Sequence, residues 1–213
     1  MLDEKELANV LHNVLGQKED GFGNPTPTSR ESQAYASGIV AALKAGSVAN
    51  ASGTITGTTA PGSPLVAGSG TGGVLTIDPG PMLEKTLNGF DPVGPLLSIE
   101  NKAVIEYIAT GLATFAPGTV TGTCTSSNDN PGPLAAGAAS GGTITGITGS
   151  GCLAAVLGAT GTLGPGAPSH YNALIDYITN NAEISYSSGS VTGTCPAGGG
   201  PLAAGAASGG VIS

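Results

Sequence analysis

The chain contains few of the side chains that bind ligands or react. Of its 213 residues only 9% are charged and 4% are aromatic, tryptophan is absent, and histidine occurs twice. A typical globular domain has about a quarter of its residues charged. The formal net charge is −8, and residues 103–213 contain neither lysine nor arginine. Because nucleic acids and anionic membranes are bound largely through basic side chains, we expect no nucleic-acid partner and no membrane partner.

Long apolar runs are missing as well. None approaches the roughly 20 residues that cross a bilayer. The first ten residues, MLDEKELANV, carry charges of both signs and lack the continuous apolar stretch of a secretory signal. We therefore expect synthesis and use without export by the general secretory route.

Cysteine is too scarce for a disulfide scaffold. The three cysteines, Cys124, Cys152 and Cys195, cannot all pair within one chain. We expect all three to be reduced and buried, as in a reducing compartment, with a Cys124–Cys195 disulfide as the alternative.

Glycine and proline are abundant instead. Glycine accounts for 37 residues and proline for 15, a composition that approaches that of disordered chains. The mean hydropathy of +0.20 opposes disorder, because disordered chains are poor in apolar residues. We expect an ordered protein.

An internal repeat dominates the sequence. The segments GTITGTT (53–59), GTVTGTC (118–124) and GSVTGTC (189–195) are each followed by a second block, PLVAGSGTGG (64–73), PLAAGAASGG (133–142) or PLAAGAASGG (201–210). The last two copies of this block are identical. Residues 79–108 also align without gaps on 149–178. Self-similarity at a fixed period indicates a protein built from repeated structural units.

The repeat predicts an α+β fold of three tandem units of about 70 residues, 1–78, 79–148 and 149–213. Each unit is expected to contain two short helices followed by two short β-strands. In the segment TVTGT, valine alternates with threonine, as in a half-buried strand. The glycine pairs at 72–73, 141–142 and 209–210 are expected to supply positive φ angles or a close backbone approach. Units this small are marginal alone, so we expect them to bury their surfaces against one another.

Capping residues and apolar stripes locate the helices. Asp3 with Glu6 is a plausible capping box for the first helix, and Ser29, Ser98 and Ser169 are expected to cap the second helix of each unit. Apolar residues at helical spacing define the buried stripes. The first helix buries Leu7, Val10, Leu11, Val14 and Leu15, and the second helices bury Ile39, Val40 and Leu43; Val104, Ile105 and Ile108; Leu174, Ile175 and Ile178.

Catalytic residues are hard to find. His12 is expected to be packed or solvated on its helix. His170 is in principle able to activate Cys124 or Cys195, but these cysteines occupy equivalent repeat positions, and the third equivalent is Thr59. A nucleophile has no reason to occur twice and be replaced once, so packing explains the pattern better. We expect no enzymatic activity and no catalytic residues.

Metal and cofactor sites are not predicted either. The acidic residues are dispersed, and the usual zinc and EF-hand spacings are missing. The Asn128-Asp129-Asn130 segment is interpreted as a solvated turn rather than a cation site. A GxGxxG match at 68–73 is followed by a strand-like segment instead of the helix that a phosphate-binding loop needs. We expect no cofactor.

The blocks VTGTC and PLAAGAASGG, repeated along the chain, resemble small structural proteins of tailed bacteriophages. The resemblance covers most of the chain and implies a virion component that acts by protein–protein contacts, such as a capsid decoration (cement) protein or a head–tail or baseplate accessory. It implies assembly in the cytoplasm of a bacterial host, with other virion proteins or copies of itself as partners. The alternative is a subunit of a cellular filament or contractile injection machine, and an enzyme or small-ligand binder comes third.

Overall fold

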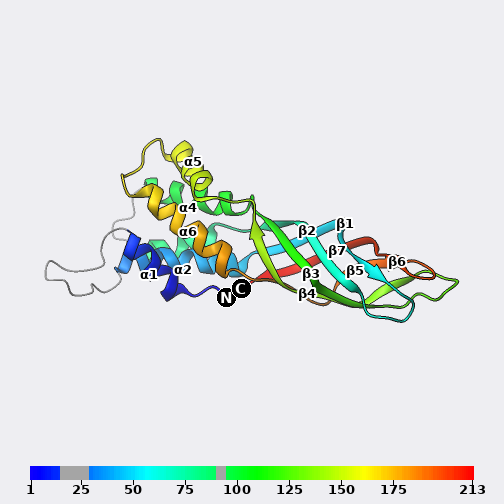
Figure 1. Ribbon diagram of the computed structural model, residues 1–213. Helices are drawn as coiled ribbons and strands as arrows, with labels where there is room; N and C mark the ends of the chain where they lie inside the picture. Colours follow the sequence, from blue (N-terminus) through cyan, green and yellow to red (C-terminus); the bar gives the residue numbers. More distant parts are fainter. Residues whose placement is uncertain (15–28, 90–94) are drawn as a thin grey trace. The chain divides into compact units, whose positions relative to one another are not determined.

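The computed structural model describes residues 1–14, 29–89 and 95–213 and contains both helices and strands (Figure 1). The predicted α+β class is therefore confirmed. The helices are α1 (Glu4–Val14), α2 (Arg30–Ala45), α3 (Gly80–Gly89), α4 (Pro95–Ile108), α5 (Gly149–Thr160) and α6 (Ala167–Asn181). The strands are β1 (Ser47–Thr59), β2 (Val66–Thr76), β3 (Leu112–Cys124), β4 (Gly132–Thr145), β5 (Ile184–Cys195), β6 (Gly200–Pro201) and β7 (Ala203–Ile212).

These elements form two compact units that separate helices from strands. The helical unit consists of Met1–Ala45, Ile77–Thr110 and Gly146–Ala182, and the strand unit of Gly46–Thr76, Gly111–Thr145 and Glu183–Ser213. Each compact unit thus draws on all three predicted tandem units, 1–78, 79–148 and 149–213. That those segments are three copies of one structure stays a prediction.

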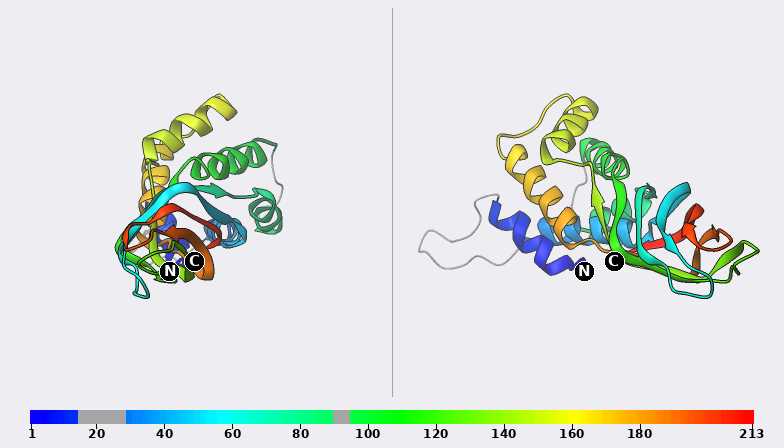
Figure 2. Two further views of the ribbon diagram at one scale, coloured as in Figure 1. Left: turned by 90° about the vertical axis from the view of Figure 1, so that its right-hand side faces the viewer. Right: turned by 45° about the vertical axis from the view of Figure 1, so that its right-hand side comes forward.

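The strand unit is a closed antiparallel sheet. Three hairpins, β1–β2, β3–β4 and β5–β7, are joined by the pairs β2–β3, β4–β5 and β7–β1. Figure 2 shows these strands coiling around one another. Closure satisfies the backbone groups that an open sheet would leave at its edges.

The contacts between hairpins recur in cyclic order. A proline at the start of each repeated block lies opposite a threonine of the next hairpin, as Pro64 does with Thr123, Pro133 with Thr194 and Pro201 with Thr58. Gly68, Gly137 and Gly205 lie so close to the carbonyl oxygens of Val120, Val191 and Ile55 that a Cβ atom would collide with them. Glycine therefore permits the close strand approach that closes the sheet.

The predicted glycine pairs serve both expected purposes. The first member, Gly72, Gly141 or Gly209, has a φ of +69°, +67° or +67°. The second member approaches a side chain of the unit's interior: a Cβ on Gly142 would meet the ring of Phe115, and one on Gly210 would meet the ring of Tyr186. The prediction of positive φ or close approach is confirmed.

The three hairpins place different side chains at positions of the sheet that align in the sequence repeat. Ile55, Val120 and Val191 are at most 1% exposed. Five residues before each of them stand Asn50, Phe115 and Tyr186, which are also buried. The aromatic rings lie 5.4 Å apart, and the Asn50 amide donates to the carbonyl of Thr71 over 3.0 Å.

The cysteine prediction was wrong for two of the three residues. Cys124 and Cys195 form a disulfide, with their Cα atoms 5.8 Å apart, whereas Cys152 is free and buried. The disulfide joins the ends of β3 and β5. At the equivalent end of β1, the Thr59 hydroxyl donates to the Gly200 carbonyl over 2.7 Å. Both residues are buried, as expected, but their equivalent positions at the ends of β3 and β5 bring the two sulfur atoms into bonding range.

The helices of the helical unit also pack in cyclic order. Each helix contacts the helix before it and the helix after it in sequence, and α6 contacts α1. The predicted stripes of the second helices are buried, and so are Leu7 and Leu11 of α1. Val10 and Val14 are only partly buried, and Leu15 lies outside the described residues.

Only part of the predicted capping is observed. Asp3 Oδ1 accepts from the backbone N–H of Glu6 over 2.9 Å, and Ser29 Oγ accepts from that of Ser32 over 3.1 Å. Ser98 and Ser169 lie inside their helices and were wrongly assigned as caps, because α4 begins at Pro95 and α6 at Ala167. Proline suits the first helical turn, where its missing N–H leaves no bond unmade.

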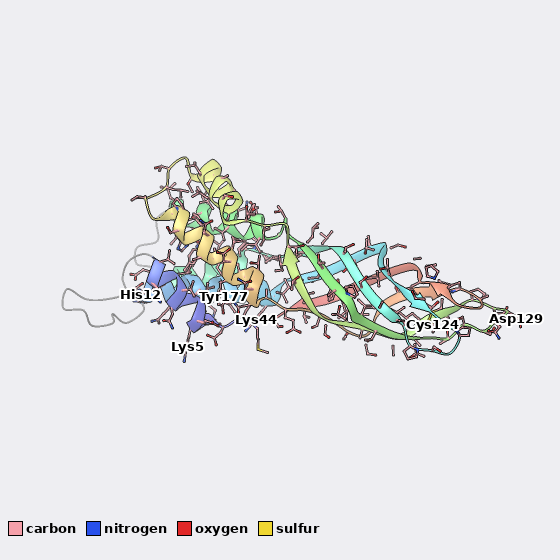
Figure 3. All side chains as sticks on the ribbon, viewed as in Figure 1. Lys5, His12, Lys44, Cys124, Asp129 and Tyr177 are labelled. Carbon is pink, nitrogen blue, oxygen red and sulfur yellow. A yellow bond between two sulfur atoms is a disulfide. The ribbon has the colours of Figure 1, made fainter. Side chains whose placement is uncertain are left out.

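Two tyrosine hydroxyls reach the start of a neighbouring helix. Tyr177, labelled on α6 in Figure 3, accepts from the backbone N–H of Asp3 before α1 over 2.9 Å. The Tyr107 hydroxyl accepts from the backbone N–H of Thr148 before α5 over 2.9 Å. Because Tyr107 and Tyr177 align in the repeat, the same contact fixes α5 against α4 and α1 against α6.

Candidate functional site

The second helices place three different side chains at one aligned position of the helical unit. Four residues before Ile39, Val104 and Leu174, which begin the buried stripes, stand Tyr35 on α2, Glu100 on α4 and His170 on α6. In an amphipathic helix, residues four apart lie on the same face. The three side chains are therefore placed on the inward face of their helices, where an apolar core residue is the usual choice.

Two cavities open at this position. The first has a volume of ≈ 200 Å³ and is lined by side chains that include Glu31, Ser32, Tyr35, Leu97, Glu100 and His170. The second, of ≈ 310 Å³, is lined by Glu100, His170, Tyr171 and the segment that leads into α6. Glu100 and His170 line both cavities.

The hydrogen bonds in this cluster are incomplete. Tyr171 donates to Glu100 Oε1 over 2.6 Å, a short bond typical of a hydroxyl and a carboxylate. Tyr35 is only 6% exposed. Its hydroxyl is buried and has no hydrogen-bond partner among the described residues. A buried hydroxyl without a partner costs about 1–3 kcal/mol.

Aromatic contacts hold the histidine in place. The His170 ring lies 5.2 Å from that of Tyr35 and 5.1 Å from that of Tyr171, both in edge-to-face geometry. Burial lowers the pKa of His170 from 6.5 to about 4, because the charged imidazolium is poorly solvated there. The imidazole is therefore neutral at pH 7 and offers one donor and one acceptor nitrogen.

Burial also keeps the neighbouring groups protonated. It raises the pKa of the Cys152 thiol to about 12, with the Glu100 carboxylate contributing. Burial raises the pKa of Tyr35 and Tyr171, and for Tyr171 the hydrogen bond to Glu100 adds to the effect. Cys152 is consequently a thiol at neutral pH, which argues against a nucleophilic role because the thiolate is the reactive form.

The residues weighed in the sequence analysis fall in separate places. His12 is buried on α1, and its Nδ1 accepts from the backbone N–H of Ser29 over 3.4 Å. His170 belongs to the helical unit, whereas Cys124 and Cys195 belong to the strand unit and are bonded to each other. Bonded cysteines have no thiol for a histidine to activate.

The other candidates also have structural explanations. Asp129, labelled at the end of the β3–β4 connection in Figure 3, is exposed, and the turn around it is closed by the Asn130 N–H donating to Ser127 Oγ over 3.0 Å. The GxGxxG match at 68–73 lies within β2. Within residues 1–14, 29–89 and 95–213, no group of three or more histidine, cysteine or acidic residues is placed to hold a metal ion.

Tyr35 and Glu100 were not singled out from the sequence. A signal was present: aligning the second helices by their apolar stripes places Tyr35, Glu100 and His170 at one position beside buried residues. Three different polar side chains at one inward position of the repeat indicate that this part of the interior differs from an ordinary apolar core. The alignment alone does not show that a cavity opens beside them.

Comparison with known proteins gave no assignment: no family model, no curated protein and no solved structure matches the chain. In the part of the chain that the structure describes, no helix is long and apolar enough to cross a membrane.

Proposed function

We propose that the protein is a structural component of a bacteriophage virion that acts by protein–protein contacts, as a capsid decoration (cement) protein or a head–tail or baseplate accessory. The proposal includes the finer account of the fold, in which residues 1–78, 79–148 and 149–213 are three copies of one helix–helix–hairpin unit. It assigns the protein no enzymatic reaction and no cofactor. Its partners are other virion proteins or further copies of the chain.

The observation that carries the proposal is the cyclic recurrence of the glycine contacts. Gly68 meets Val120, Gly137 meets Val191, and Gly205 returns to Ile55. A single chain with this order has the contact pattern of a closed trimer. Closed rotational symmetry is the usual way in which protein assemblies repeat one interface. A pseudo-threefold chain is suited to a place where three equivalent surfaces of a shell or tail meet.

The disulfide removes one argument for the proposal, which was the expected reduced state of the cysteines. The expected reduced cysteines agreed with assembly in a bacterial cytoplasm, but Cys124 and Cys195 are bonded. Disulfides are rare in reducing cytoplasm and persist outside cells. A virion component experiences both environments, because particles are assembled inside the host and then released. The bond is therefore compatible with a part of the released particle.

The direct test is whether the protein is found in particles. Virions are purified on a density gradient from a lysate of the source culture and probed with an antibody raised against the chain. We expect the protein to sediment with the particles at a fixed ratio to the major capsid protein. Recovery only in the soluble fraction, with none in intact particles, would contradict the proposal.

The alternative, a subunit of a cellular filament or injection machine, predicts a different solution behaviour. Native mass is measured by light scattering across a concentration series. A monomer or closed oligomer of constant mass supports an accessory that decorates a scaffold made by other proteins. Open-ended growth of the mass with concentration would favour the filament.

A further inference from the structure

We infer that Cys124 and Cys195 form a redox switch that controls only one end of the strand unit. The turns within its three hairpins, residues 60–65, 125–131 and 196–199, lie at this end, called here the turn end (Figure 1). With the disulfide formed the turn end is ordered, and with both thiols reduced it opens while the rest of the sheet stays closed. The inference does not rest on the proposed function.

The first observation is the place of the bond in the sheet. It joins Cys124, the last residue of β3, to Cys195, the last residue of β5. These strands are not neighbours, because β4 lies between them. Figure 3 labels Cys124 on the same side of the strand unit as Asp129 of the β3–β4 turn. The bond therefore restrains the turns more directly than it restrains the pairing along the strands.

The second observation is how the three turns are held to one another. The N–H of Cys124 donates to the carbonyl of Ser63 over 2.9 Å, and the N–H of Gly198 donates to the carbonyl of Ser127 over 3.0 Å. The first contact is made by a bonded cysteine itself. The second joins the two segments that follow the cysteines. Reduction thus releases the segments on which both contacts depend.

The strand pairing at the turn end is also weak by composition. A proline of each repeated block lies opposite a threonine there, as described above for Pro64, Pro133 and Pro201, and proline has no N–H to donate between strands. Three successive glycines, residues 198–200, have positive φ angles. Glycine gains more conformational freedom on release than any other residue. Both features favour opening once the covalent bond is cut.

The third observation is the hydroxyl of Ser126, two residues after Cys124. Ser126 is only 6% exposed, and its Oγ has no hydrogen-bond partner among the described residues. A buried polar group without a partner costs free energy that is recovered when the group reaches water. The closed turn end therefore carries a cost, which the disulfide offsets and which reduction allows the turn to relieve.

Away from the turn end, the sheet closes without help from the disulfide. Ile55, Val120 and Val191 fill its interior and are at most 1% exposed. The hydrogen bond of 2.8 Å between Tyr186 and Asn50 joins β5 to β1. Apolar burial of this kind is the main stabilising contribution in a fold. We therefore expect reduction to leave this part of the strand unit folded.

The switching reaction is thiol–disulfide exchange with a low-molecular-weight disulfide such as oxidised glutathione. The thiolate of one cysteine attacks a glutathione sulfur and releases one glutathione, and the second cysteine attacks the mixed disulfide and releases the other. The two cysteines lose two electrons and two protons, which the two glutathione molecules gain, and reduction is the reverse. Cys124 is 1% and Cys195 0% exposed, so attack on either sulfur requires the turn end to open first.

The experiment compares ¹⁵N relaxation of the full chain in its disulfide-bonded form and after refolding in the reductant tris(2-carboxyethyl)phosphine. On reduction, the order parameters of the Cys124, Thr125 and Gly198 amides are expected to fall from about 0.85 to below about 0.6. Those of Ala113 and Ile144, which pair with each other in β3 and β4, are expected to stay near 0.85. Unchanged values at the turn end, an equal fall at all five amides, or unfolding of the whole strand unit would overturn the inference.

Variants assign the response to these two cysteines. The Cys124→Ser, Cys195→Ser double variant is expected to have an open turn end with and without reductant. Cys152→Ala is the matched control, because it removes the free thiol of the helical unit and keeps the switch. A redox response in the double variant, or none in a folded Cys152→Ala protein, would contradict the assignment. If the double variant does not fold, the reduced wild type decides the question.

The rate of reduction tests the requirement for opening. Dithiothreitol is applied to the native protein and to the urea-denatured chain at the same pH, and the thiols released are counted over time. We expect the native bond to be reduced at least about tenfold more slowly, because its sulfur atoms are reached only when the turn end opens. Equal rates would show that the sulfur atoms are accessible in the closed form and would contradict the switch.

Discussion

The hydroxyl of Tyr186 donates a hydrogen bond of 2.8 Å to Oδ1 of Asn50, although the two residues are 136 positions apart in the sequence. Both side chains are buried within the strand unit. They occupy equivalent positions of the repeat, on β5 and β1, and the third position holds Phe115. An amide, a phenol and a phenyl ring thus fill one layer that an exact repeat would fill with three identical side chains.

Loss of the Tyr186 hydroxyl is expected to destabilise the protein. Tyr186→Phe leaves the buried Asn50 oxygen without its donor, which costs about 1–3 kcal/mol. Urea unfolding measures the change. The control is Tyr35→Phe, which removes a hydroxyl that has no partner among the described residues and is expected to leave stability unchanged or raise it. A larger loss for Tyr35→Phe than for Tyr186→Phe would contradict the hydrogen-bond assignment.

The close approach at Gly205 makes a second prediction. A Cβ atom there would collide with the backbone carbonyl of Ile55, so Gly205→Ala is expected to cost about 3 kcal/mol or more, as the β1–β7 pairing must shift. Gly158→Ala is the contrasting change, because a Cβ on Gly158 of α5 meets open space. It is expected to stabilise by about 0.5–1 kcal/mol. Thermal and urea unfolding compare the two, and equal effects would argue against strand closure through Gly205.

Positive φ alone is tested at Gly141. A Cβ there meets no atom within 4 Å, so the cost of Gly141→Val comes from the backbone angle of +67°. We expect a loss of about 1–3 kcal/mol. Ser140→Val, at the exposed neighbouring position of β4, has no such angle and is expected to stay within about 0.5 kcal/mol of wild type. A loss below that value for Gly141→Val would show that the left-handed conformation is not required.

The Cys124–Cys195 disulfide is tested by counting free thiols and by reducing the bond. A thiol titration of the denatured, non-reduced protein is expected to find one thiol per chain, that of Cys152. The Cys124–Cys195 bond spans 71 residues, and its reduction is expected to cost about 2–4 kcal/mol by freeing the unfolded chain. The Cys124→Ser, Cys195→Ser double variant is expected to unfold alike with and without reductant. Three thiols in the non-reduced wild type would contradict the bond.

Protonation of His170 is expected to weaken the fold at acidic pH. Its pKa is about 4 in the folded protein, against 6.5 ordinarily, so the unfolded chain takes up the proton first as pH falls. The stability due to the neutral ring is complete above pH 6.5 and is lost between pH 6.5 and 4, by at most about 3 kcal/mol.

The measurement compares the wild type with the His170→Gln variant, which lacks this proton uptake. Wild type is expected to lose more stability than the variant between pH 7 and 4. The His170 ring, followed directly by NMR, is expected to titrate near pH 4. A midpoint near 6.5 would contradict its burial.

Much of the local structure was predictable because the same sequence pattern occurs in three segments of the chain. The stripes on the second helices, the strands around TVTGT and the positive φ at Gly72, Gly141 and Gly209 are local properties that recur with the sequence. The first residues of α4 and α6, which we expected at Ser98 and Ser169, were not predictable in the same way. Proline in the first turn competes with a serine cap, and the sequence pattern does not rank the two.

For the candidate site, the sequence could predict only which residues share one aligned position on the second helices. Aligning the helices places Tyr35, Glu100 and His170 in register, but the cavities and the unpartnered hydroxyl of Tyr35 depend on how α2, α4 and α6 pack. The Cys124–Cys195 disulfide stood only as the alternative prediction for a similar reason. Equivalence in the repeat described Cys124 and Cys195 as similar, whereas their bond required the ends of β3 and β5 to meet.

The sequence by itself determined the α+β content, the stripes that face inward and the glycines that allow tight backbone geometry. These follow from periodicity and from the conformational range of single residues, both of which act over a few neighbours. Only the tertiary structure decided that the hairpins close into one sheet, that two of three equivalent residues become a disulfide, and that a carboxylate, an imidazole and an unpaired phenol share one cavity wall. Those features depend on contacts between residues far apart in the sequence, such as Gly68 with Val120 and Cys124 with Cys195, whose geometry no local pattern fixes.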